Sequence, residues 1–196
     1  MGLVRWNGGV HGPHHKRSFH NLSEYGRANA MDASMVGRVH SLTSGEGSSQ
    51  DALVIDRTSE WWTGENFSDL AEYLRVVTAE GYPADRIRHS VCSCGGNIHG
   101  LRVDSVESVA QRTCVACGAS AFIADSEEEW SEAQPESWQC VCGNDSAEVG
   151  VGFSLRSDGE VWWVTLGQRC ASCGVLGVVV DWKISYGPST HLLDQV

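Results

Sequence analysis

The chain has 196 residues and a formal net charge of −11, from 14 Lys and Arg against 25 Asp and Glu. A nucleic-acid binder needs a cationic stripe for phosphates, and lysine occurs here only at Lys16 and Lys183, so the composition disfavours that class. No apolar run approaches the length of a membrane span, and no secretory signal is evident, so we expect a cytoplasmic protein that does not contact membranes.

Residues 1–35 are rich in Gly, His, Ser and Asn and have no helical or strand period. We expect a flexible arm. Four histidines fall within ten positions and leave a transition-metal site open as the alternative, at His11, His14, His15 and His20.

Residues 36–91 predict a small α+β module. Two β-prone runs, 36–42 and 52–55, flank a turn rich in Gly and Ser and are expected to pair as a hairpin. A helix follows, because Asn66 or Ser68 can cap it and Gly81 can end it. Its apolar stripe is expected to face a core and consists of Leu70, Tyr73, Leu74 and Val77.

Eight cysteines form four pairs in the order CxC, CxxC, CxC, CxxC, and each pair is followed directly by glycine. Two such pairs supply the four soft ligands of a tetrahedral zinc site, and glycine accepts the positive φ of the tight turn. We therefore predict two bound Zn²⁺, although disulfides, an iron centre and redox thiols remain alternatives. The predicted ligand sets are Cys92, Cys94, Cys114, Cys117 and Cys140, Cys142, Cys170, Cys173.

The two sets lie in segments that follow one plan, which indicates a tandem repeat of 92–125 and 140–181. Its landmarks include Gln111–Arg112 and Gln168–Arg169, and an aspartate eight residues after the last cysteine of each set. Strands are expected at 98–103 and 106–113 in the first copy. In the second copy they are expected at 148–155, 161–166 and 176–184, the first of these with alternating polar and apolar residues.

This arrangement of knuckles and hairpins resembles the zinc-ribbon, or rubredoxin-knuckle, class over about half of the chain. The resemblance implies metal-stabilised β ribbons at 92–125 and 140–196 but no particular activity. Residues 149–196 also resemble uncharacterised bacterial zinc-ribbon proteins, which implies no function. Between the ribbons, residues 126–139 are predicted to form a short acidic helical linker that begins with a capping box of Ser126 and Glu129.

Two complete sets of four cysteines leave no open coordination position, and no catalytic motif occurs, so we expect a non-enzyme. The chain is rich in tryptophan for small β modules. Core packing is one explanation, and a surface that binds a protein partner is the other. The tryptophans proposed for that surface are Trp61, Trp62, Trp162, Trp163 and Trp182.

The sequence therefore favours a non-catalytic, zinc-stabilised protein that binds a protein partner, of basic character because this chain is acidic. One alternative is a redox switch, because the second set is similar to the zinc site of bacterial redox-regulated holdase chaperones. That hypothesis predicts that Cys140 to Cys173 respond to oxidants before Cys92 to Cys117. A nucleic-acid-associated ribbon is the least favoured hypothesis.

Overall fold

The computed structural model describes residues 54–196, which form mostly β-sheet with few helices. The predicted arm 1–35 and most of the predicted hairpin lie outside the described residues. The helices are α2 (Phe67–Thr78) and α3 (Ser126–Glu129), with a 3₁₀ turn at Thr190–Asp194. The strands are β1 (Arg86–His89), β2 (Ile98–Asp104), β3 (Val109–Cys114), β4 (Ser120–Phe122), β5 (Glu136–Ser137), β6 (Ser146–Leu155), β7 (Val161–Cys170) and β8 (Leu176–Lys183).

Helix α2 confirms the predicted start and stripe. The Asn66 side chain accepts a hydrogen bond from the Asp69 backbone N–H, and the Asp69 carboxylate accepts one from the Asn66 N–H, which makes a complete capping box. Leu70 and Leu74 are fully buried and Tyr73 is nearly so. The helix is therefore fixed by its cap and by an apolar face on the sheet.

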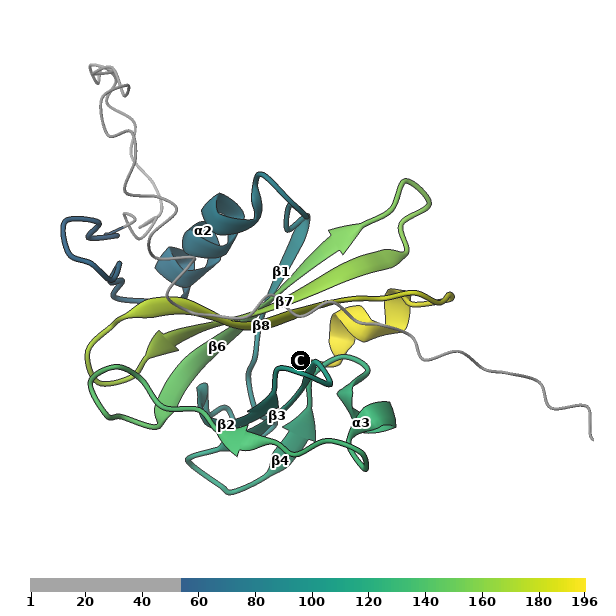
Figure 1. Ribbon diagram of the computed structural model, residues 1–196. Helices are drawn as coiled ribbons and strands as arrows, with labels where there is room; N and C mark the ends of the chain where they lie inside the picture. The colour runs from purple at the N-terminus through teal and green to yellow at the C-terminus, as the bar shows by residue number, and fades with distance from the viewer. Residues whose placement is uncertain (1–53) are drawn as a thin grey trace, which may run out of the picture.

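All strands belong to one eight-stranded sheet, whose main path runs β4-β3-β2-β6-β7-β8. The two hairpins, β2–β3 and β6–β7, meet where Ile98–Gly100 pair antiparallel with Ser146–Glu148. Figure 1 shows α2 on one side of β6, β7 and β8, with β2, β3 and β4 below them. The two predicted ribbon segments thus share a sheet, and their apolar side chains share a core cluster.

The sheet has two halves, the first from β1 to β4 and the second from β5 to β8, and each half contributes a strand that pairs with the other half. Strand β1, which precedes the first cysteine pair, pairs with β6, where Arg88 lies opposite Val151. Strand β5, which precedes the third pair, pairs with β2, where Glu136 lies opposite Val103. Backbone N–H groups continue both pairings, from Ser90 to the Val149 carbonyl and from Trp138 to the Leu101 carbonyl. The exchange is reciprocal, so neither half completes its sheet alone.

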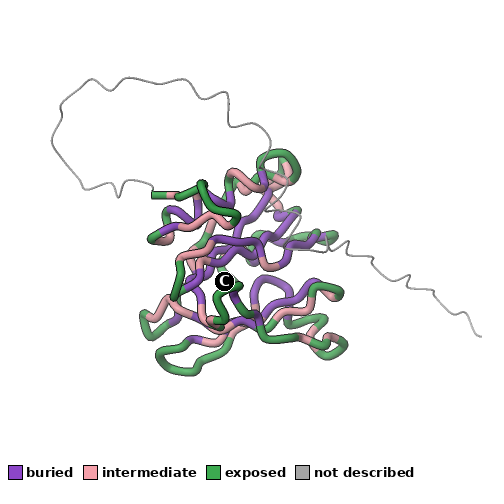
Figure 2. The backbone as a smooth tube through the Cα atoms, turned by 60° about the vertical axis from the view of Figure 1, so that its left-hand side comes forward, coloured by how far each residue is buried: buried purple, intermediate pink, exposed green. Residues whose placement is uncertain are grey.

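Strand β6 differs from the predicted alternation, because both of its faces are covered. Val149, Val151 and Phe153 are fully buried in the main core. On the other face, glycines leave room for α2. A Cβ at Gly150 would lie 3.1 Å from Phe67, and one at Gly167 on β7 would lie 2.6 Å from Leu74. Figure 2 shows buried backbone concentrated along these central strands.

Helix α3 corrects the predicted linker. It has only four residues, begins after Asp125, and has no side-chain cap. The Ser126 hydroxyl instead donates to the Ile123 carbonyl at 2.6 Å and accepts from the Ala110 N–H at 3.0 Å. Ser126 is fully buried, and these two backbone groups occupy its hydroxyl. The predicted capping box with Glu129 is therefore wrong.

Candidate metal centres

The structure brings the cysteines together in the two predicted sets of four. Within each set, all four sulfur atoms lie within 4.8 Å of one another. In the first set, the Sγ atoms of Cys92 and Cys117 are 3.6 Å apart and those of Cys94 and Cys114 are 3.7 Å apart. The second set repeats these distances for Cys140 to Cys173 and Cys142 to Cys170.

Those distances suit a tetrahedral metal site. Zn–S bonds of about 2.3 Å in a tetrahedron place sulfurs about 3.8 Å apart, whereas a disulfide needs about 2.05 Å. None of the eight cysteines, all of which lie in the described residues, forms a disulfide. Two four-cysteine groups of this geometry are compatible with structural metal binding, and the donor set of four sulfurs fits zinc or iron.

The backbone around the two sets follows one pattern. The N–H of Cys92 bonds the Gly96 carbonyl and the N–H of Cys140 bonds the Asn144 carbonyl, both at 2.8 Å. At the other knuckles, the N–H of Cys114 bonds the carbonyl of Ala119, and the N–H of Cys170 bonds that of Val175. The glycine after each pair has a φ between 73° and 87°, as predicted from its position.

Backbone hydrogen bonds lower the pKa of one cysteine thiol in each set. Hydrogen bonding from the Cys94 backbone lowers the pKa of Cys92 to about 6. Burial acts to raise the pKa of Cys170, but backbone hydrogen bonds from Cys173 and Ser172 outweigh it and bring that pKa to about 7. Each set therefore contains one thiol that ionises near neutral pH to the thiolate, which is the form that binds metal.

One side chain distinguishes the two sites. Asn144 donates a hydrogen bond from Nδ2 to the Cys170 sulfur at 3.4 Å. The corresponding residue in the first site is Gly96, where a Cβ would lie only 2.9 Å from the Cys114 sulfur. The first site therefore lacks a side-chain donor to sulfur. The role of Asn144 was not predicted from the sequence, although an Asn directly after the second CxCG motif indicates it.

The two sites are linked by a row of paired residues across the sheet. Cys114 lies opposite His99, His99 opposite Ala147, and Ala147 opposite Cys170. With strands about 4.8 Å apart, the Cα atoms of Cys114 and Cys170 are separated by about 14 Å. Each site thus includes the last residue of a strand, Cys114 of β3 or Cys170 of β7, and both strands belong to the same sheet.

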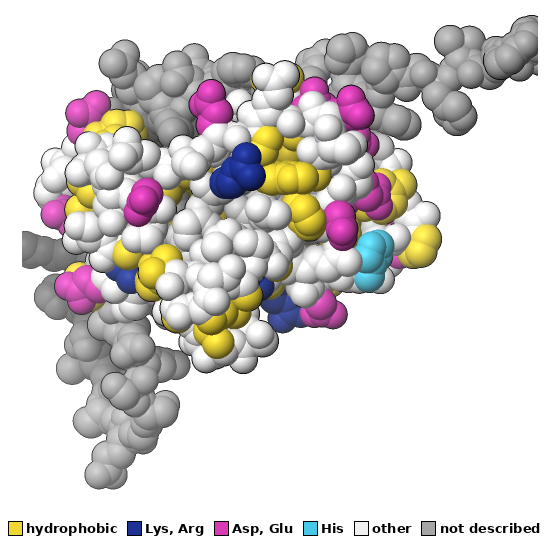
Figure 3. All heavy atoms as spheres, turned by 90° about the horizontal axis from the view of Figure 1, so that it is seen from below, with side chains coloured by type: hydrophobic (Ala, Val, Ile, Leu, Met, Phe, Trp, Pro, Cys, Tyr) yellow, Lys and Arg dark blue, Asp and Glu magenta, His cyan; other side chains and the backbone are white. Residues whose placement is uncertain are grey.

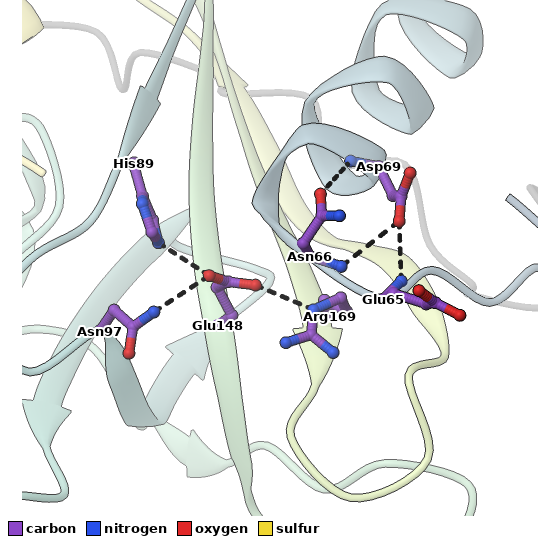
Figure 4. A network of polar contacts seen from close by, with 7 residues as sticks. All are labelled: Glu65, Asn66, Asp69, His89, Asn97, Glu148 and Arg169. Atoms are coloured by element: carbon purple, nitrogen blue, oxygen red, sulfur yellow. Dashed lines mark hydrogen bonds and ion pairs between the residues drawn. The ribbon is translucent and has the colours of Figure 1, made fainter. Parts of the chain in front are cut away.

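A buried ionic cluster lies close to this row (Figure 4). Glu148, only 4% exposed, accepts hydrogen bonds from Arg169 at 2.8 Å and from Asn97 at 3.1 Å. His89 Nε2 lies 3.1 Å from the same carboxylate, and its ring stacks on Phe67 at 4.0 Å. The cluster joins β1, β6 and β7 with the loop before β2, and pattern analysis did not find it because its members are far apart in sequence.

The predicted correspondence between Gln111–Arg112 and Gln168–Arg169 is wrong by one residue. Relative to the cysteines, Arg112 occupies the position of Gln168, since Arg112 lies opposite Leu101 and Gln168 opposite Val149. Arg112 is therefore buried in the main core face, where it lies 3.3 Å from His99 Nε2. Arg169 projects to the other face and meets Glu148.

The five tryptophans proposed for partner binding occupy different environments. Trp182 is fully buried and donates from its indole to Asp125 at 2.8 Å, and Trp163 is 4% exposed and donates to Asp181 at 3.1 Å. Trp61 and Trp62 are half-buried, and Trp162 is exposed. Only the last three can contact a partner of the folded chain.

The surface on the side of β2, β3 and β4 carries small groups of hydrophobic side chains, with acidic side chains along its rim (Figure 3). Within residues 54–196, no helix combines the length and apolar character that a membrane span requires. Neither of the histidines near the first set, His89 and His99, belongs to a group of potential metal ligands in the described residues. Comparison with protein-family models, curated proteins and solved structures gave no match.

Proposed function

We propose that both sites hold structural Zn²⁺ and that the chain is a non-catalytic protein that binds a protein partner. The observation that carries this proposal is the presence of two complete sets of four sulfurs at tetrahedral spacing. When bound, zinc supplies a cross-link between chain segments, and a site with four protein ligands leaves no position for water or substrate. The matching backbone hydrogen bonds at both sites support a tandem repeat as their origin.

The negative charge of this chain indicates which kind of protein surface it would bind. Two zinc ions held by eight thiolates add about four negative charges to the formal net charge of −11. A basic protein surface therefore complements this chain electrostatically. Trp162 is the exposed aromatic side chain best suited to anchor such a partner, because Trp is enriched at binding hot spots.

Elemental analysis of untagged protein purified without added metal tests the first part of the proposal. We expect two zinc ions per chain. Iron, a single zinc, or no metal would contradict structural zinc at both sites.

Capture of partners at low and at physiological ionic strength tests the second part. We expect a basic protein that the wild-type chain retains and the Trp162→Ala variant loses, with Val106→Ala, another exposed hydrophobic position, as the matched control. Turnover of a substrate that depends on residues other than cysteine would refute the non-catalytic assignment.

A redox switch is the second candidate, and a specific observation favours it. Each site has two exposed cysteines, at Cys94 and Cys117 and at Cys142 and Cys173, which peroxide can reach. The Asn144 hydrogen bond to the Cys170 sulfur should reduce the reactivity of the second set. We therefore expect the first set to react first, in the reverse of the order expected from sequence. Retention of both metals under mild peroxide would eliminate this candidate.

A further inference from the structure

A small cavity lies between the C-terminal end of α2 and strands β7 and β8, on the face of the sheet that α2 covers. Its volume is about 220 Å³. The lining is mainly aliphatic and aromatic and includes Val77, Thr78, Tyr82, Trp163, Val178 and Asp181. Among these side chains, Asp181 is the acidic one, and neither the metal sites nor the partner surface uses it.

The Asp181 carboxylate is buried, and no cation pairs with it in the described part of the chain. It is 8% exposed, and its Oδ2 accepts a hydrogen bond from the Trp163 indole at 3.1 Å. Within residues 54–196, none of the ion pairs includes Asp181. The corresponding aspartate of the first half, Asp125, is bonded by both Trp182 and Tyr186. Burial raises the pKa of Asp181, and the hydrogen bond from the Trp163 indole offsets that cost only in part.

Two other features at the cavity also favour positive charge. Helix α2 has twelve residues and ends at Thr78, so the negative end of its dipole is directed toward the cavity. Tyr82 stacks on Trp163 with ring centroids 3.9 Å apart, and these rings form an aromatic wall. Aromatic rings attract cations, and an apolar wall weakens the screening of a charge pair.

We propose that this cavity binds a small organic ammonium ion, with Asp181 as its counter-ion. An ammonium group offers N–H donors to the carboxylate and to the hydroxyl of Thr165, which also lines the cavity. A metal cation fits less well, because hard cations require about six oxygen ligands. The cavity is smaller than the roughly 300–1,000 Å³ that accommodates drug-sized ligands, so the stem of the amine is limited to a few carbons. This site is independent of the function proposed for the metal centres.

Butylammonium and its neutral analogue butan-1-ol provide matched probes. The full chain with both metal sites filled is titrated with each probe at pH 7 and constant ionic strength, and the Trp163 indole N–H resonance is followed by NMR. We expect a saturable shift with butylammonium and binding of butan-1-ol that is at least about tenfold weaker. A charge-assisted hydrogen bond of about 1.5–3 kcal/mol corresponds to roughly a 10- to 100-fold change in affinity.

The Asp181→Asn variant keeps an oxygen acceptor for Trp163 and removes the charge, so we expect roughly 10- to 100-fold weaker binding of butylammonium. Asp125→Asn is the matched control, because it is the same change at the corresponding position outside the cavity, and it should bind as the wild type does. Equal binding of the amine and the alcohol, an unsaturable shift, or unchanged affinity in Asp181→Asn would overturn the proposal. If Asp181→Asn does not fold, the amine and alcohol titrations of the wild-type chain decide alone.

Discussion

The reciprocal exchange of β1 and β5 predicts that the two metal sites are thermodynamically coupled. Replacing Cys142 with Ser removes one ligand of the second site at an exposed position, so the change disturbs little packing. We nevertheless expect the first site, Cys92 to Cys117, to lose affinity for its metal. The reason is that β6 pairs with both β1 and β2 of the first half.

The size of the coupling follows from the strand pairs that cross between the halves. These are 86–89 with 150–153, 98–100 with 146–148, and 102–103 with 136–137. At about 1 kcal/mol net for each backbone hydrogen bond, their loss costs on the order of 5 kcal/mol or more. Because 1.4 kcal/mol corresponds to a factor of ten, the affinity of the first site should fall by roughly a thousandfold or more.

Native mass spectrometry during a chelator titration measures this coupling. The wild-type chain should pass from two metals to none with little one-metal species, and Cys142→Ser should retain less than one metal under conditions that keep wild type full. Ser172→Ala, an exposed change in the other knuckle of the same site without loss of a ligand, is the control. A Cys142→Ser chain that keeps one tightly bound metal, with wild-type hydrogen-exchange protection in β2 and β3, would refute the reasoning.

Three further predictions concern single side chains. Gly167→Ala places a Cβ 2.6 Å from Leu74 Cδ2 and should lower the free energy of unfolding, measured with urea, by about 1–3 kcal/mol. Gly81→Ala is the control, because a Cβ there meets open space. Equal urea midpoints for the two variants would contradict the packing of α2 on β7. Burial, and then the Arg112 charge, lower the pKa of His99 to about 4. As the pH falls, His99 takes up a proton in the unfolded chain before it does so in the folded chain. The free energy of unfolding should therefore fall between pH 6.5 and 4 by roughly 2–3 kcal/mol more in wild type than in His99→Gln. Parallel pH profiles of the two proteins would argue against a buried neutral imidazole. Asn144→Gly should raise the rate at which peroxide oxidises the cysteines of the second set toward the rate of the first set, as followed by mass spectrometry of alkylated peptides. An unchanged rate would remove the role of the Asn144 hydrogen bond.

Local patterns were sufficient for much of the fold. Asn66 and the stripe from Leu70 to Val77 predicted α2, because capping and helical periodicity act within a few residues. The spacing of the cysteines and the glycines after them predicted both sets of four, since a knuckle is a local turn. The hairpin of β6 and β7 followed from β-prone runs around Gly159, whose φ is 87°.

Other features depend on residues that are distant in sequence. No local signal indicates that β1 pairs with β6 and β5 with β2, because strand exchange is decided by which edges remain free when the hairpins meet. The one-residue offset of Arg112 from Arg169 reverses the face of the sheet that each side chain joins, since side chains alternate along a strand. Ser126 likewise looked like a helix cap, but its hydroxyl was needed by buried backbone.

The sequence by itself determined helix α2, the longer strands and the two groups of four cysteines, because capping, turn geometry and cysteine spacing are properties of short segments. Only the tertiary structure decided that both sets share one sheet, that Trp163 and Trp182 bond to aspartates, and that Asp181 faces a cavity beside α2. Those outcomes depend on which faces become buried together, and burial is a property of the whole packed chain.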